Sequence, residues 1–194
     1  MDTDLRIVVV DRNPMRAAII EDGLREAGHR NVRRIEDTEG LEDRLRGIEA
    51  DVVLVDLESP SRDVLEHVFA ASGAASRPVA MFVDRSDSAM INAAIDAGVS
   101  AYIVDGLKKE RVKSILDMTI SRFNAFAKLK DELEAARSQL ADRKAIDRAK
   151  ALVMKAKGIG EEQAYQLMRK AAMNENRKVA DIARAIITAA ELLK

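Results

Sequence analysis

Four aspartates follow short apolar runs in the first half of the chain, and they are the residues best placed to do chemistry. They are Asp11, Asp56, Asp84 and Asp105. If the apolar runs are parallel strands, their carboxyl ends share one edge of a sheet, so these carboxylates would gather in an acidic pocket. Arg12, directly after the first of them, could neutralise Asp11 or Asp56 by direct pairing.

The elements that would position this pocket are predicted from hydrophobic periodicity. The expected strands are Leu5–Val10, Val32–Ile35, Asp51–Asp56, Pro78–Val83 and Ala101–Val104. Helical patterns separate them, over Pro14 to Gly28, after a capping Thr38, over Val64 to Ala71, and from Ser86 to Gly98. Apolar strands that alternate with helices predict an α/β domain with a parallel sheet covered on both faces.

Composition excludes several classes of protein. The absence of cysteine rules out disulfides, thiolate metal sites and a cysteine nucleophile. We expect His29 and His67 to be ordinary turn or surface residues and predict no metal site. Aromatic residues make up 3% of the chain, which argues against recognition of bases by aromatic stacking. No apolar run has the roughly 18 residues of a membrane span, so we expect a cytoplasmic protein without membrane contacts.

Charge is divided unevenly along the chain. Residues 1–106 contain 12 Arg, no Lys and 21 Asp or Glu, whereas residues 107–194 contain 20 Lys or Arg and 12 Asp or Glu. This asymmetry suggests an acidic control domain followed by a basic region that meets nucleic acid. The alternative is that the charges only solvate helix surfaces.

A long helix is predicted to connect the two regions, because Lys108 to about Leu140 contains neither Gly nor Pro. Apolar residues recur there at steps of three and four, which indicates a coiled-coil seam and hence a homodimer. The seam residues are Val112, Leu116, Thr119, Phe123, Phe126, Leu129, Leu133, Ala136 and Leu140. Packing of the helix on its own sheet would explain the first four of these residues but not the last four.

The basic region predicts an all-α bundle of three short helices. The first carries Ile146 to Ala156, the second begins at Glu161 after a Gly-Ile-Gly break, and the third covers Val179 to Leu193. Basic side chains lie off the predicted core faces and form stripes suited to a phosphate backbone. The residues predicted to bind nucleic acid are Arg143, Lys144, Arg148, Lys150, Lys155, Lys157, Arg177, Lys178 and Arg184.

The strand-and-aspartate pattern of residues 4–120 resembles the receiver domain of bacterial response regulators, which has a flavodoxin-like α/β fold. The segments that carry the resemblance are VVVDRNP, DVVLVDLESP, PVAMFVD and AGVSAYIVDG. It implies that Asp56 is equivalent to the phospho-acceptor, that Asp11 belongs to a Mg²⁺-binding pocket, and that Tyr102 is the aromatic switch residue.

The sequence departs from the receiver pattern at four positions. Arg12 replaces an acidic residue, Val83 a hydroxyl residue, Asp105 a lysine and Gly106 a proline. Phosphoryl transfer to a carboxylate needs a bridging metal and groups that bind the phosphoryl oxygens. We therefore predict a pseudo-receiver, meaning a receiver fold regulated by protein contact, without a cofactor. A working phospho-acceptor that uses Mg²⁺ at Asp11 and Asp56 remains the alternative.

The basic region resembles the ANTAR domain of antitermination regulators of the AmiR and NasR type. The matching elements include Ala149-Lys150, Leu167-Met168-Arg169, Asn176-Arg177-Lys178 and Asp181-Ile182-Ala183. The expected organisation is a receiver-like domain at 1–122, a helical linker at 108–140 and an ANTAR domain at 137–194. This order is most similar to NasT-like regulators of nitrate and nitrite assimilation.

The resemblance implies a regulator that binds paired hairpins of a leader mRNA and thereby prevents formation of a terminator. It also implies a partner, a NasS-like nitrate/nitrite sensor protein that sequesters the regulator. The alternative function is a phosphorylation-activated response regulator that binds DNA through its C-terminal helices, although no helix-turn-helix spacing is clear. An enzyme is not expected, since the chain shows no phosphate-binding glycine loop and no nucleophile paired with a base.

Overall fold

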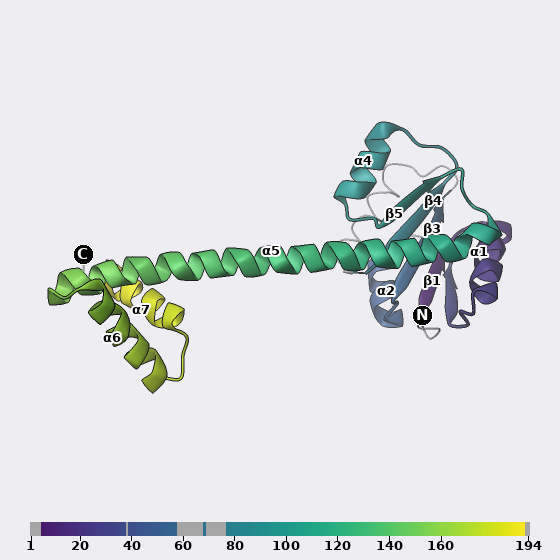
Figure 1. Ribbon diagram of the computed structural model, residues 1–194. Helices are drawn as coiled ribbons and strands as arrows, with labels where there is room; N and C mark the ends of the chain where they lie inside the picture. Colours follow the sequence, from purple (N-terminus) through teal and green to yellow (C-terminus); the bar gives the residue numbers. More distant parts are fainter. Residues whose placement is uncertain (1–4, 38, 58–67, 69–76, 193–194) are drawn as a thin grey trace. The chain divides into compact units, whose positions relative to one another are not determined.

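The computed structural model describes residues 5–37, 39–57, 68 and 77–192, and the chain divides into two compact units, residues 1–127 and 128–194. The first unit is an α/β domain (Figure 1). Its strands are β1 (Ile7–Val10), β2 (Val32–Ile35), β3 (Val52–Leu57), β4 (Val79–Val83) and β5 (Ala101–Val104). Its helices are α1 (Pro14–Glu26), α2 (Leu41–Ile48), α4 (Ser88–Asp96) and the first part of α5 (Lys109–Lys157).

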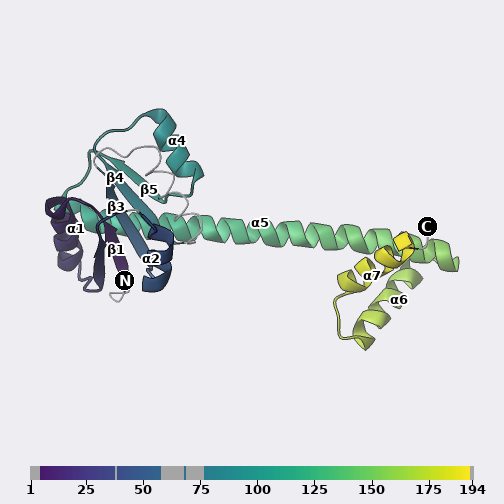
Figure 2. The ribbon, with the colours of Figure 1, turned by 180° about the vertical axis from the view of Figure 1, so that it is seen from behind.

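The five strands form one parallel sheet in the order β2-β1-β3-β4-β5. Side chains alternate between its faces, so each face builds its own core. On one face α1 and α5 pack over Ile7, Val9, Leu54 and Phe82, and on the other α2 and α4 pack over Val8, Val55 and Met81 (Figure 2). The predicted fold is confirmed. Because all pairings are parallel, the carboxyl ends of the five strands lie along the same edge of the sheet.

Local sequence explains where most helices begin and end. Pro14 occupies the first turn of α1, and the Asn13 side chain accepts a hydrogen bond from the Met15 amide. The predicted cap at Thr38 lies outside the described residues, and Gly40 stands at the N-cap of α2. The helix predicted over Val64 to Ala71 also lies outside them, apart from the buried Val68.

The second unit consists of the last part of α5, α6 (Glu161–Asn174) and α7 (Val179–Leu192). We expected a separate first helix here, but α5 is continuous from Lys109 to Lys157. The reason is that Arg137 to Lys144 contains no Gly or Pro that would end a helix. Gly158, with φ of 64°, ends α5 where the sequence predicted a break.

Within the described residues, no helix has the length and apolar character needed to cross a membrane.

Candidate functional site

An arginine from α1 binds the carboxylates at the carboxyl edge of the sheet. Arg16 donates from Nε and Nη2 to the two carboxylate oxygens of Asp56, with both distances 2.8 Å. Its Nη1 lies 2.9 Å from an Asp84 oxygen. The Asp56 side chain is fully buried and the Arg16 side chain is 19% exposed, so this is a largely desolvated, bidentate ion pair. Hydrogen bonding to Asp56 is the largest influence that raises the pKa of Arg16.

The hypothesis that Arg12 neutralises Asp11 or Asp56 was wrong. Arg12 is exposed and precedes the helix cap, whereas Arg16 lies in the first turn of α1. In a parallel α/β fold, a helix that follows a strand begins at the carboxyl edge of the sheet, so its first turn faces the strand ends. A basic residue about five positions after the strand-end aspartate was therefore the signal that could have identified Arg16.

Asp11 is buried beside this pair. One oxygen accepts a hydrogen bond of 2.7 Å from the Asn13 amide, and the other has no hydrogen-bond partner within the described part of the chain. Burial, reinforced by the nearby Asp56 carboxylate, raises the pKa of Asp11 to about 6. The pocket thus holds one carboxylate neutralised by Arg16 and a second that is close to half protonated near pH 6.

A magnesium ion does not fit this arrangement. Mg²⁺ requires carboxylate oxygens that are open to an octahedral shell, and both oxygens of Asp56 are occupied by Arg16. Over residues 5–37, 39–57, 68 and 77–192, no group of three or more acidic or histidine side chains could hold a metal ion.

The other predicted pocket residues lie in varied surroundings. Asp105 is exposed, has a positive φ of 47°, and makes no side-chain contact with Arg16 that the described residues reveal. Val83, at the position expected for a hydroxyl residue, is the buried last residue of β4. The Tyr102 hydroxyl is hydrogen-bonded to the Ser86 hydroxyl at 2.9 Å.

The helical unit has a small core built largely from alanine. Ala149 of α5, Met168 of α6 and Ala183 of α7 are buried together. Small residues at these positions let three short helices approach closely, which leaves their long basic side chains at the surface.

The nine candidate RNA-binding residues divide into two groups. Four of them form ion pairs: Arg148 with Glu191, Lys150 with Asp147 and Glu161, Arg177 with Glu175, and Arg184 with Asp181 and Asp142. Five are exposed and form no ion pair with any described residue: Arg143, Lys144, Lys155, Lys157 and Lys178.

Lys150 is the least accessible of the nine, with a side chain 16% exposed. Hydrogen bonds to Asp147 and then to Glu161 raise its pKa, and the second ties α5 to the start of α6. This geometry favours a structural role for Lys150 over contact with a phosphate.

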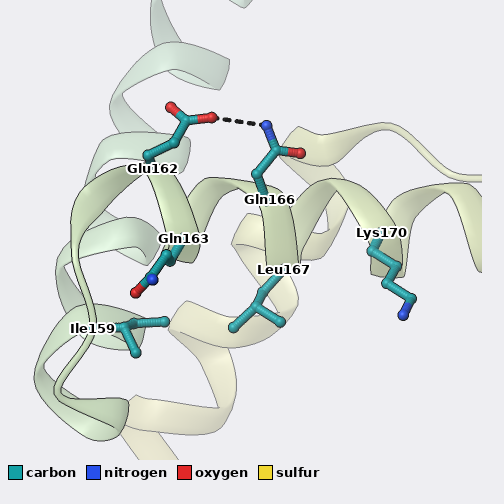
Figure 3. Close-up of a pocket in the computed structure, with 6 residues that line it drawn as sticks. All are labelled: Ile159, Glu162, Gln163, Gln166, Leu167 and Lys170. Atoms are coloured by element: carbon teal, nitrogen blue, oxygen red, sulfur yellow. Dashed lines mark hydrogen bonds between the residues drawn. The ribbon is translucent and has the colours of Figure 1, made fainter.

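A surface hollow of about 480 Å³ lies on α6 and was not anticipated (Figure 3). Ile159 and Leu167 supply its apolar lining, and Gln163 and Lys170 supply polar groups. Gln166 at its rim donates a 2.8 Å hydrogen bond to Glu162. Sequence periodicity assigned Leu167 to the apolar face of this helix together with Ala164 and Met168, but the Leu167 side chain is 44% exposed whereas the other two are buried.

The sheet order β2-β1-β3-β4-β5, with aspartates at the strand ends, is that of a receiver-like fold. A CheY-like response regulator receiver domain from Methanospirillum hungatei JF-1 has the same fold, with a TM-score of 0.55 and 15% identity over 63% of this chain and 98% of that one. Residues 134–187 match the ANTAR domain family. The segment from 134 to 187 therefore carries an ANTAR domain.

Two curated proteins are similar to the chain over different shares of its length. The transcriptional regulatory protein PdtaR of Mycobacterium tuberculosis is 25% identical over 185 residues, which cover 94% of this chain and 89% of PdtaR. The nitrate regulatory protein of Klebsiella oxytoca is 36% identical over 76 residues, which cover 39% of this chain and 19% of that protein.

Proposed function

We propose that this protein is an RNA-binding antitermination regulator that holds hairpins of a leader mRNA and so prevents the overlapping terminator from forming. The observation that carries the proposal is the ANTAR match at residues 134–187, which coincides with the helical unit. The match to PdtaR along nearly the whole chain supports a regulator of transcription.

The surface chemistry of the helical unit supports RNA as the ligand. Lys144, Lys155 and Lys157 are exposed cations on the last turns of α5, and a phosphate backbone binds such groups with release of counterions. The α6 hollow adds apolar and amide groups beside Lys170, which suit an unstacked base in a hairpin loop.

The regulated genes are proposed to be those of nitrate or nitrite assimilation, with a NasS-like nitrate/nitrite sensor protein as the controlling partner. The similarity to the Klebsiella oxytoca nitrate regulatory protein supports this step, although the match spans 19% of that protein. When the sensor binds nitrate or nitrite, it would release the regulator.

Two features of the chain support control by protein contact. The guanidinium of Arg16 donates to both oxygens of Asp56, and this ion pair makes the phospho-acceptor equivalent a weaker nucleophile. On α5, Phe126, Leu129, Leu133 and Leu140 are between 50 and 70% exposed, which suits a coiled-coil homodimer as the active form.

The decisive experiment is a gel-shift titration of the full-length protein with a two-hairpin leader RNA at several salt concentrations, with duplex DNA as competitor. We expect preferential binding of RNA and a linear fall of log K with log salt. Lys144→Ala combined with Lys155→Ala should weaken binding about tenfold or more and reduce the salt slope by about 1 to 2. Lys130→Ala, an exposed lysine on the same helix outside the ANTAR match, is the control.

Equal affinity for duplex DNA would instead favour the phosphorylation-activated DNA-binding regulator, as would RNA binding that appears only with acetyl phosphate.

A further inference from the structure

The α/β unit contains a second cavity, of about 750 Å³, lined by α1, the turn that follows it and β2. Helix α1 contributes Glu21 and Arg25 to its lining, which are four residues apart and so lie on one face of the helix. Strand β2 contributes Val32 and Arg34, which are two residues apart and so point to one side of the sheet. The volume is that of a small-molecule site.

The turn between α1 and β2 closes the cavity. Gly28 has a φ of 96°, a left-handed conformation that favours glycine, and its amide donates to the Arg25 carbonyl. The His29 amide donates to the Leu24 carbonyl, which completes a Schellman turn. This turn sends the chain back toward the sheet, with Gly28, His29 and Arg30 along the cavity wall.

His29 is the unexpected residue of this wall. The sequence predicted an ordinary turn or surface histidine, and the residue does lie in the turn, but it is only 5% exposed because the turn directs it inward. Its Nδ1 is buried and has no hydrogen-bond partner within the described part of the chain. A buried polar atom without a partner carries an unrecovered desolvation cost, and such atoms are uncommon in folded proteins.

The charge of the cavity is also unusual for this half of the chain. Three arginines line it and only one carboxylate, Glu21, does so, whereas acidic residues outnumber arginines across residues 1–106. Arg30 is exposed and forms no ion pair with a described residue.

The other two arginines are held weakly. Arg25 pairs with Asp22 at a site where both side chains are more than half exposed. Arg34 lies 3.6 Å from Glu36 and 3.4 Å from the Asp11 carbonyl oxygen. The exposed Arg25–Asp22 pair contributes little, and the contacts of the part-buried Arg34 are long, so both guanidiniums could exchange these partners for a stronger one.

We propose that this cavity binds a small multivalent oxyanion, a phosphate-bearing or polycarboxylate molecule. Guanidinium groups from a helix, a turn and a strand converge on it, and each can hold a phosphate or carboxylate in a bidentate manner. Glu21 would accept a hydrogen bond from a hydroxyl or amine of the same ligand. The proposal does not depend on the RNA-binding function.

The test is isothermal titration calorimetry of the full-length protein with pyrophosphate and, separately, with citrate, both at constant ionic strength. Saturable binding of one stoichiometric equivalent is expected for at least one of the two probes, and their comparison distinguishes a phosphate site from a carboxylate site. Arg30→Gln should weaken that binding about tenfold or more, because it removes a charged bidentate donor.

Arg33→Gln is the matched control, since Arg33 belongs to the same basic segment but points to the opposite side of β2. It should bind the probe as the wild type does. Absence of saturable binding, or an equal loss in the Arg30 and Arg33 variants, would overturn the proposal. So would retention of full binding in Arg30→Gln.

Discussion

Arg16 is the residue on which the character of the Asp56 pocket depends. Replacement of Arg16 by Ala would leave the fully buried Asp56 carboxylate without its counter-charge. We expect the free energy of unfolding to fall by about 3 kcal/mol, because removal of one partner strands the other in a low-dielectric site. Urea denaturation followed by circular dichroism measures this, with Arg12→Ala as the control that should change stability by less than about 0.5 kcal/mol.

A double variant separates the ion pair from general packing. Asp56→Asn combined with Arg16→Ala should be less destabilised than the sum of the single variants, because the stranded charge is gone. Additive losses would show that Arg16 acts through packing of α1 and not through Asp56.

Asp11 should make stability depend on pH. Its pKa is raised from 3.8 to about 6, so the folded state binds a proton more tightly than the unfolded state. Stability from this residue is complete below about pH 4 and is lost as pH rises through 6. Asp11→Asn should therefore be more stable than the wild type by about 3 kcal/mol at pH 8 and nearly equal at pH 4.

Thermal unfolding of both proteins from pH 4 to pH 8 checks this sign. Asp105→Asn, at an exposed site, is the control and should follow the wild-type profile. If Asp11→Asn raised the stability by the same amount at every pH, the titration of Asp11 would not be the cause of the increase.

At the scale of elements, α5 serves two purposes along its length. Val112, Leu116 and Thr119 are buried against the sheet, so the first part of the predicted seam is used within the chain. Leu133 and Leu140 lie seven residues apart, are at least half exposed, and remain available to a second helix.

Leu133→Lys combined with Leu140→Lys should convert a homodimer to a monomer without unfolding either unit. Both side chains are exposed in the single chain, so their replacement removes no intramolecular packing. Sedimentation velocity measures the oligomeric state, and Ser138→Lys, on the opposite side of the helix, should leave it unchanged. A wild-type protein that sediments as a monomer at micromolar concentration would contradict the coiled coil.

The elements were predictable because their signals are local. Each signal involves only a few residues. The β-branched runs coincide with the strands, Pro14 marks the start of α1, and glycines mark the ends of helices. The partner of Asp56 was not predictable from local pattern alone, since Arg12 and Arg16 are both near Asp11 in sequence and only the direction of α1 selects between them. The burial of His29 was not predicted for the same reason, because it depends on where the chain turns after α1.

At the scale of the whole molecule, the two units have different chemistry. The α/β unit keeps its central carboxylate neutralised by its own arginine, and the helical unit exposes five candidate cations that form no ion pair with a described residue. We therefore propose that control of the RNA-binding unit comes from a binding partner or from dimerisation and not from a phosphoryl group on Asp56.

This division leads to a prediction about phosphate donors. Acetyl phosphate with Mg²⁺ should change neither the affinity of the wild-type protein for leader RNA nor its sedimentation, because Arg16 blocks both the metal and the attacking oxygen. Fluorescence anisotropy with labelled RNA measures the affinity, and Asp56→Asn should bind RNA as the wild type does. Tighter binding that appears with acetyl phosphate in the wild type and disappears in Asp56→Asn would instead make Asp56 a working phospho-acceptor.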